Sequence, residues 1–285
     1  WAKAFGTHQS RTDADFSVAT RHNIGGVVMG ADILPSEHIL LGAFGGFAHS
    51  RLEFDDKSQN NSGARPIDTN TAFGGLCGRI EFAHGLFAKG GVTVGYAHGD
   101  AGERLRANNL TTGGIETITG GEDAGCGAAS NLTIGVYIPA RDGALQVIPS
   151  VTLGHATQWR EGYQESGTAA QGIDDYLVTV LNARMQLAGQ IQHTTQSGGV
   201  VVARVRAGMD AEQDVSEDVD LNMLNNSFSV KVADDAVQFG GFLGANLMLA
   251  QNETLSFTLE GELNFASNNA DELGGQLTAG VRAQF

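Results

Sequence analysis

The residues in this sequence best suited to catalysis or metal binding are its eight histidines, whose imidazole rings titrate near neutral pH. No two of them stand in an HxxxH or HExxH spacing, and the chain contains no GxSxG nucleophile motif. Most fall beside predicted turns or at the ends of predicted loops, among them His38, His84 and His98. We therefore interpret the histidines as scattered interfacial residues and predict no catalytic residue.

An acidic segment, Asp214 to Asp220, places oxygen-bearing side chains at alternate positions, as a calcium-binding loop does at its start. Its sixth position is Val219 instead of glycine, and its twelfth is Asn225 instead of glutamate, so we interpret it as a solvated acidic loop. The two cysteines, Cys77 and Cys126, lack a CxxC spacing and are too few for a disulfide scaffold. We expect free thiols, no metal site and no cofactor.

The elements that must position the charged residues are strands with one apolar face, because polar and apolar side chains alternate along much of the chain. The C-terminus shows this best: residues 273–285 place Leu, Ala, Val and Phe on one face and Gln, Thr and Arg on the other. The same alternation recurs in residues 177–191, 201–209 and 254–265. Alternation alone also describes a soluble β-sandwich.

The connections between strands distinguish a membrane barrel from a sandwich. Turn signals predict about twelve strands, near residues 1–9, 22–34, 39–54, 70–83, 86–106, 127–140, 144–160, 170–193, 199–213, 227–250, 254–267 and 271–285. Short turns such as 35–37 alternate with long polar segments such as 107–126, a layout typical of outer-membrane barrels. We predict an all-β fold, a 12-stranded antiparallel transmembrane β-barrel with short periplasmic turns and long extracellular loops.

Composition excludes other classes of protein. The longest apolar run, residues 39–48, is about half the length of a bilayer-spanning helix, so helical spans are excluded. A formal charge of −15 argues against nucleic acid as a partner. Residues 1–5 do not resemble a secretory signal, which leaves a cytosolic protein or the downstream part of a longer precursor.

Twelve tilted strands would enclose a lumen about 14 Å across, which admits one α-helix or one extended chain. The charged residues that face it by parity are Arg79, Glu81, Lys89, Arg184, Arg204, Arg206, Glu260, Glu262 and Arg282. Two interpretations stay open: a solvated wall of internal ion pairs, or contacts with a segment threaded through the pore. Inward glycines, as in residues 41–46 and 90–96, leave room for bulky aromatic side chains or for a plug.

Motifs spread over the whole chain carry a resemblance to a known family. They are the opening strand at 1–6, the glycine-rich segments 25–32 and 41–50, the Pro-containing strand 148–151 and the aromatic-x-Glu-x-Gly segment within 162–167. The last strand, with Leu277, Val281 and Phe285 on its apolar face, is similar to the terminal-aromatic signal read by the barrel assembly machinery. In this order and spacing, the motifs resemble the C-terminal translocator domain of autotransporters, the monomeric type Va secretion proteins of Gram-negative bacteria.

The resemblance implies that residues 1–285 form one translocator domain without the linker helix and passenger that precede it in the family. It implies an outer-membrane protein, with extracellular loops and periplasmic termini, that enables export of an N-terminal passenger to the cell surface. Implied partners are outer-membrane lipid and lipopolysaccharide, the barrel assembly machinery, periplasmic chaperones, and the barrel's own upstream linker and passenger. The barrel itself is expected to be a monomer.

We do not expect an enzyme, although some members of the family cleave their passenger inside the barrel. Glu81, Glu260 and Glu262 are analogues of such lumen acids by chemistry alone, and no residue is assigned to catalysis. Two rival hypotheses are a free-standing outer-membrane channel or adhesin with acidic partner-binding loops, and an outer-membrane hydrolase that uses lumen or loop acids.

Overall fold

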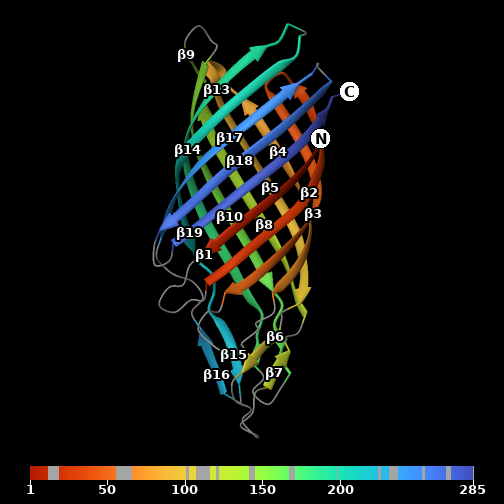
Figure 1. Ribbon diagram of the computed structural model, residues 1–285, viewed down its shortest axis with the longest axis vertical. Helices are drawn as coiled ribbons and strands as arrows, with labels where there is room; N and C mark the ends of the chain where they lie inside the picture. Colours follow the sequence, from red (N-terminus) through yellow and green to blue (C-terminus); the bar gives the residue numbers. More distant parts are fainter. Residues whose placement is uncertain are drawn as a thin grey trace.

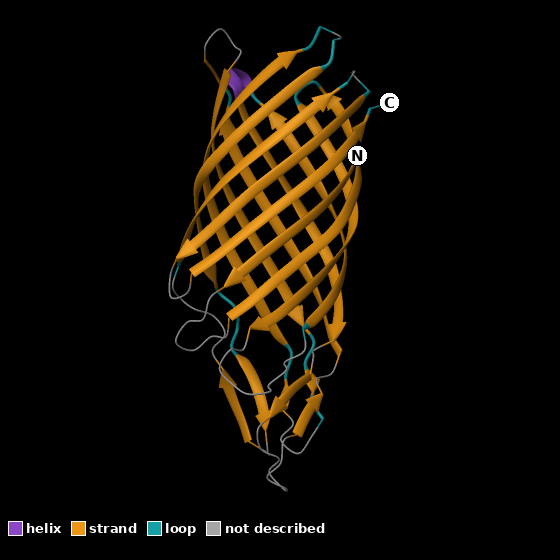
Figure 2. Cartoon of the chain, in the orientation of Figure 1, coloured by secondary structure: helices purple, strands orange, loops and turns teal. Residues whose placement is uncertain are grey.

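Twelve strands of the described residues close into one antiparallel barrel (Figures 1 and 2). The computed structural model describes residues 1–11, 19–55, 66–100, 103–106, 116–119, 122–140, 145–166, 171–196, 198–223, 226–230, 237–251, 254–267 and 271–284. Around the wall the strands are β1 (Ala2–Arg11), β2 (Ala19–Ser36), β3 (Ile39–Asp55), β4 (Ile67–Glu81), β5 (Leu86–Asp100), β8 (Glu122–Val136), β10 (Leu145–Arg160), β13 (Tyr176–Thr194), β14 (Val200–Asp214), β17 (Gln238–Ala250), β18 (Leu255–Ser267) and β19 (Asp271–Ala283). Pairing of β19 with the whole length of β1 closes the cylinder. The predicted fold class is confirmed.

At the loop end, three predicted strands run past the barrel strands that the structure contains, and at the turn end the strand predicted at 127–140 runs past β8 into the short strand at Ile138–Ala140. The strand predicted at 86–106 ends as β5 at Asp100, and a separate strand, β6 (Glu103–Arg106), follows it. The strands predicted at 170–193 and 227–250 each include a short outer strand, β12 (Gln171–Ile173) and β16 (Asn226–Val230). These boundaries are wrong because alternation continues from the wall into the loops, and only the pairing partner tells the two apart.

The two ends of the barrel differ in the length of their connections. One end, the turn end, holds both chain termini and tight connections such as the 3-10 turn η1 (Ala83–Gly85) (Figure 1). The short strand β9 (Ile138–Ala140) pairs with β10 at this end. At the other end, the loop end, described parts of the long connections form small sheets beyond the wall: β6 with β7 (Glu116–Thr119), and β11 (Tyr163–Gln164) with β12, β15 (Val219–Met223) and β16.

The two faces of the wall carry different side chains. Large apolar residues on the outer face are open to the surroundings: Met29 is 63% and Met185 66% exposed. A surface this apolar over a whole cylinder is covered by lipid in outer-membrane barrels. Inside, a small buried apolar cluster of Phe87, Ile148 and Ala188 packs near the turn end. Among the described residues, no helix is long and apolar enough to cross a membrane.

Aromatic rings lie over glycines on the inner face of β1 to β4. The Phe73 ring lies where a side chain at Gly46 would begin, since a Cβ there would be 2.5 Å from the ring and 2.5 Å from Val27 O. The same arrangement joins Phe5 with Gly26, Phe44 with Gly75, and Trp1 with Gly30. We call these four pairs the ring wall. They confirm that inward glycines leave room for aromatic side chains.

Candidate functional site

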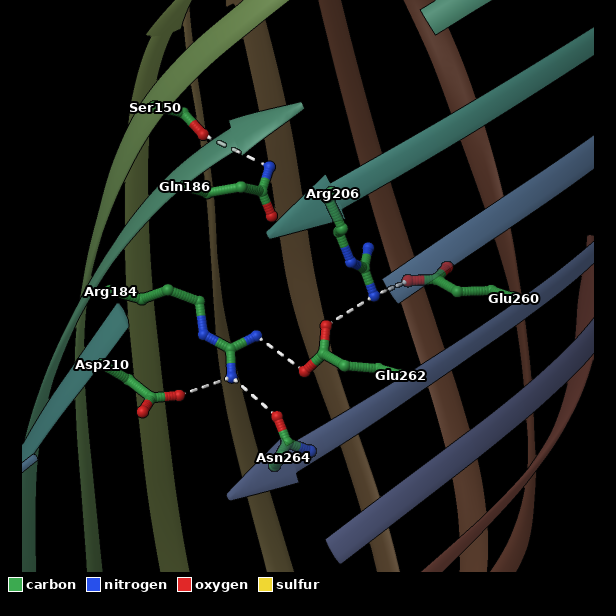
Figure 3. A network of polar contacts seen from close by, with 8 residues as sticks. All are labelled: Ser150, Arg184, Gln186, Arg206, Asp210, Glu260, Glu262 and Asn264. Carbon is green, nitrogen blue, oxygen red and sulfur yellow. Dashed lines mark hydrogen bonds and ion pairs between the residues drawn. The ribbon is translucent and has the colours of Figure 1, made fainter. Parts of the chain in front are cut away.

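A network of charged side chains crosses the inner face of β13, β14 and β18 (Figure 3). Arg184 of β13 donates from Nη1 to Glu262 Oε1 (2.9 Å) and from Nη2 to Asp210 Oδ2 (3.1 Å). Arg206 of β14 places Nη2 2.7 Å from Glu262 Oε2 and 2.5 Å from Glu260 Oε1. Glu262 therefore joins the two arginines. We call these five residues the lumen network.

Glu262 is the most enclosed member of the lumen network, with a side chain that is 5% exposed, against 32% for Glu260. Its Oε2 atom faces Arg206 without the alignment of a hydrogen bond, so that contact is electrostatic. Two guanidinium groups share three carboxylates, which leaves one negative charge in excess within the network. Because a buried charge is stable only when paired, Glu262 depends on the two arginines.

Strand β17 lies between β14 and β18 and makes room for the long side chains around it. A Cβ at Gly244 would lie 2.7 Å from Arg206 Nε, and the Phe242 ring occupies the space that a Cβ at Gly208 would need. The guanidinium carbon of Arg184 sits 4.1 Å from the centroid of that ring, a cation–π contact. The Phe242 ring therefore holds the Arg184 guanidinium beside its carboxylate partners, Glu262 and Asp210.

The remaining residues expected in the lumen occupy separate positions nearer the turn end. Arg79 pairs with Glu81 and donates to the Tyr137 hydroxyl at 3.1 Å. Arg204 donates from Nε to Gln190 Oε1 at 3.0 Å. Arg282 of β19 forms an ion pair with Asp32 of β2, on the other side of β1, with Nη2 3.2 Å from Oδ2. The lumen network thus unites four of the nine expected residues, Arg184, Arg206, Glu260 and Glu262, and leaves five apart.

A cavity of about 670 Å³ lies inside the barrel against the lumen network. Its lining runs from Lys89 on β5, through Arg184 and Arg206, to Glu272 on β19, so it spans the lumen from wall to wall. Lys89 forms no ion pair with another described residue. Within the described ranges, no three His, Cys, Asp or Glu side chains gather as metal ligands would. The described cysteines, Cys77 and Cys126, are both free.

The residues expected to form an assembly signal lie on the opposite face. Leu277 and Val281 of β19 point outward and are 58% and 39% exposed. Phe285 lies outside the described residues. The acidic segment expected to be a solvated loop leads from β14 into β15, where the Ser216 hydroxyl accepts a bond from Thr179 N at 2.9 Å.

Sequence reasoning missed several lumen residues that complete these contacts. Asp210 and Asn264 share the parity of Arg206 and Glu262 on their own strands, so extending the alternation by two or four residues would have found them. Asp32, which forms an ion pair with Arg282 and accepts a hydrogen bond from the Trp1 indole, follows a glycine-rich run and could have been found in the same way. Tyr137 follows the end of β8, so the alternation of side chains along a strand does not predict which way it points.

The Autotransporter beta-domain family model matches residues 1–262. The chain belongs to this family. It is therefore an outer-membrane β-barrel of the translocator type. No curated protein sequence matches the chain at a significant level.

Solved autotransporter barrels share this fold at low sequence identity. The β-domain of the Bordetella autotransporter BrkA superposes with a TM-score of 0.71 at 14% identity, over 100% of this chain and 98% of that one. The translocator domain of NalP from Neisseria meningitidis gives 0.67 at 13%, over 100% and 88%. The transport unit of AIDA-I from Escherichia coli gives 0.54 at 13%, over 100% and 90%. The resemblance inferred from the motifs is confirmed.

Proposed function

We propose that this autotransporter barrel enables export of an N-terminal passenger to the cell surface. The observation that carries the proposal is how the chain enters the wall. The Trp1 backbone nitrogen donates to Gly30 O at 2.8 Å, and its indole Nε1 donates to the lumen carboxylate of Asp32 at 2.9 Å. Residues placed upstream of Trp1 would therefore start at the mouth of the polar lumen, at the turn end.

We also propose that the turn end faces the periplasm and the loop end faces the cell exterior. An even number of strands returns both termini to the same side, and in this class that side carries the short turns. The loops beyond the rim would then be the part of the barrel that meets lipopolysaccharide and the surroundings.

Residues 1–285 are proposed to act as one monomeric translocator domain that performs no chemistry of its own. Among the lumen acids, Glu81, Glu260 and Glu262 each form an ion pair with an arginine. A carboxylate engaged in this way is a structural partner and is poorly placed to act as a general base. This supports a conduit over a hydrolase or a self-cleaving barrel, and the absence of enzyme activity stays a prediction.

The test is surface protease accessibility of an epitope placed upstream of Trp1 through a helical linker. It is measured for the intact barrel and for a matched chain that lacks β19. We expect the epitope to be exposed on cells only with the intact barrel. An inserted, heat-modifiable barrel whose epitope stays protected would overturn export and would favour the rival channel.

The outward residues of β19 are proposed to be read during assembly. Leu277, Val281 and Phe285 would present an apolar edge to the barrel assembly machinery after periplasmic chaperones deliver the chain. Val281→Asp combined with deletion of Phe285 should lower outer-membrane insertion several-fold, because the outward face of the last strand loses its apolar end. Thr278→Asp, which changes an inward position of the same strand, is the control, and normal amounts of inserted barrel in the first variant would contradict the proposal.

A further inference from the structure

The charges of the lumen wall are segregated along the barrel axis. Toward the turn end lie six basic residues, which we call the cationic zone: Lys3, Arg79, Lys89, Arg204, Arg206 and Arg282. Arg79, Lys89 and Arg204 each stand within five residues of the turn end of their strands. Lys89 lies within electrostatic range of three arginines, Arg79, Arg204 and Arg206, and of one carboxylate, Glu260.

The cationic zone keeps a net positive charge after its ion pairs are counted. Arg79 pairs with Glu81, Arg206 with both Glu260 and Glu262, and Arg282 with Asp32, so six basic residues meet four carboxylates. The other three cations have no carboxylate partner among the described residues: Lys3 lies 5.7 Å from the Trp1 ring, Arg204 binds the Gln190 amide, and Lys89 faces the cavity.

Acidic residues gather on the same wall toward the loop end. We call Asp210, Glu212, Asp214 and Glu272 the acidic zone. Asp210, Glu212 and Glu272 line the same lumen cavity, and Asp214 follows Glu212 by two residues on the same face of β14. Arg184 pairs with Asp210, Arg11 stands opposite Glu272 at the rim, and Arg160 of β10 has inward parity at the same end. Four carboxylates against three arginines leave one negative charge in excess among these residues. Glu212 follows Arg206 by six residues on β14, about 20 Å along the strand.

One continuous space connects the two zones. The lumen cavity is lined by Lys89 and Arg206 from the cationic zone and by Asp210, Glu212 and Glu272 from the acidic zone. An ion inside the barrel therefore meets both charge signs in series. At 0.01 M salt the Debye length is about 30 Å, and at 1 M it is about 3 Å, so the zones act across the whole lumen only at low salt.

We infer that the lumen is a bipolar pore that conducts small ions more readily in one direction than in the other. The cationic zone concentrates anions and the acidic zone concentrates cations. When the loop-end compartment is positive, cations enter through the acidic zone and anions through the cationic zone, and both accumulate in the lumen. The opposite voltage empties the lumen of both. Conductance is higher with the loop end positive, and this activity does not depend on passenger export.

The test is current recorded from one inserted barrel at a time in a planar bilayer, using the full chain 1–285 and potassium chloride. An N-terminal biotin, with streptavidin added to one side, reports which side the turn end faces. We expect currents at equal and opposite voltages to differ by about 2-fold at 0.01 M salt and to become equal at 1 M, where screening is complete. Equal currents at low salt, or an inserted barrel that passes no current, would overturn the inference.

Two variants remove the asymmetry from opposite ends. Lys89→Gln with Arg204→Gln, and separately Glu212→Gln with Glu272→Gln, should each bring the current ratio toward one. Under a salt gradient, the first should shift the reversal potential toward cation selectivity and the second toward anion selectivity. Heat-modifiable mobility verifies that each barrel is folded. Arg51→Gln, which removes a charge from the outer wall, is the control and should leave both readouts unchanged. Shifts of the same sign in both lumen variants would contradict the bipolar pore.

Discussion

The ring wall on β1 to β4 and the lumen network on β13, β14 and β18 face the same lumen, yet different interactions hold their side chains in place. In the ring wall, an aromatic ring fills the space above a glycine, and a Cβ at Gly46 would collide with Phe73. In the lumen network, long charged side chains meet across strands, and Glu262 joins Arg184 to Arg206. The first wall is held by packing and the second by ion pairs.

The contrast shows how a barrel without a central apolar core can still fix its inner side chains. Packing of a ring on a backbone is local and tolerates no added atom. The lumen network lies beside one such ring–glycine contact. The Phe242 ring covers Gly208, and the Arg184 guanidinium lies over that ring. The ring wall is therefore suited to holding the wall in register, and the lumen network presents charge to whatever occupies the pore.

The largest expected effect comes from breaking the lumen network at its centre. Glu262→Ala breaks two enclosed ion pairs at once, leaves Arg184 and Arg206 with one carboxylate each, and should lower the free energy of unfolding by about 3 kcal/mol. Urea unfolding in detergent micelles, followed by tryptophan fluorescence, measures the loss. The control is Glu260→Ala, whose side chain is more exposed and should cost less than about 1 kcal/mol. Equal losses would show that enclosure does not set the cost.

The next largest effect breaks the ring wall. Gly46→Ala should destabilise the barrel by about 2 kcal/mol, because the added methyl meets both the Phe73 ring and a backbone oxygen that cannot move away. Gly25→Ala, an outward glycine of the neighbouring strand with nothing within 4 Å of its Cβ position, is the matched control and should be neutral. The same unfolding assay applies, and a neutral Gly46→Ala would refute the packing account.

A smaller effect is expected at Arg184, whose guanidinium contacts both an aromatic ring and two carboxylates. Arg184→Lys keeps the positive charge, loses the planar fork that reaches Glu262 and Asp210 together, and weakens the contact with Phe242. The free energy of unfolding should fall by about 1 kcal/mol. In a Phe242→Leu background the same substitution should cost less, and an unchanged cost would mean that the ring does not position the guanidinium.

The smallest expected effect is the coupling energy between a substitution in the ring wall and one in the lumen network. Glu262→Ala and Gly46→Ala lie on different strands and share no partner in the contacts described above. Their free-energy losses should add to within about 0.5 kcal/mol in the double variant. The double variant is unfolded beside both single variants under the same conditions. A coupling well above this value would mean that the two walls do not fold as separate networks.

The sequence predicted the barrel well because strand alternation and turn length are local properties. Twelve strands and the inward parity of Arg184 and Glu262 follow from a period of two. The partners of those residues did not follow, because strand tilt and register decide that Glu262 meets Arg184 of β13 across two intervening strands. The strand boundary at Gln238 was missed for the same reason, since only pairing separates β16 from β17.

The most direct test of export through the barrel is whether the exported chain contacts lumen-facing residues on its way to the cell surface. A photo-crosslinking residue is placed at Gln186, which points into the lumen beside the network, or at the adjacent Met185, which faces outward. The epitope upstream of Trp1 is then followed during export. The account predicts crosslinks from Gln186 to the upstream segment and none from Met185. Surface exposure of the epitope with crosslinks only from Met185, or from neither position, would contradict export through this lumen.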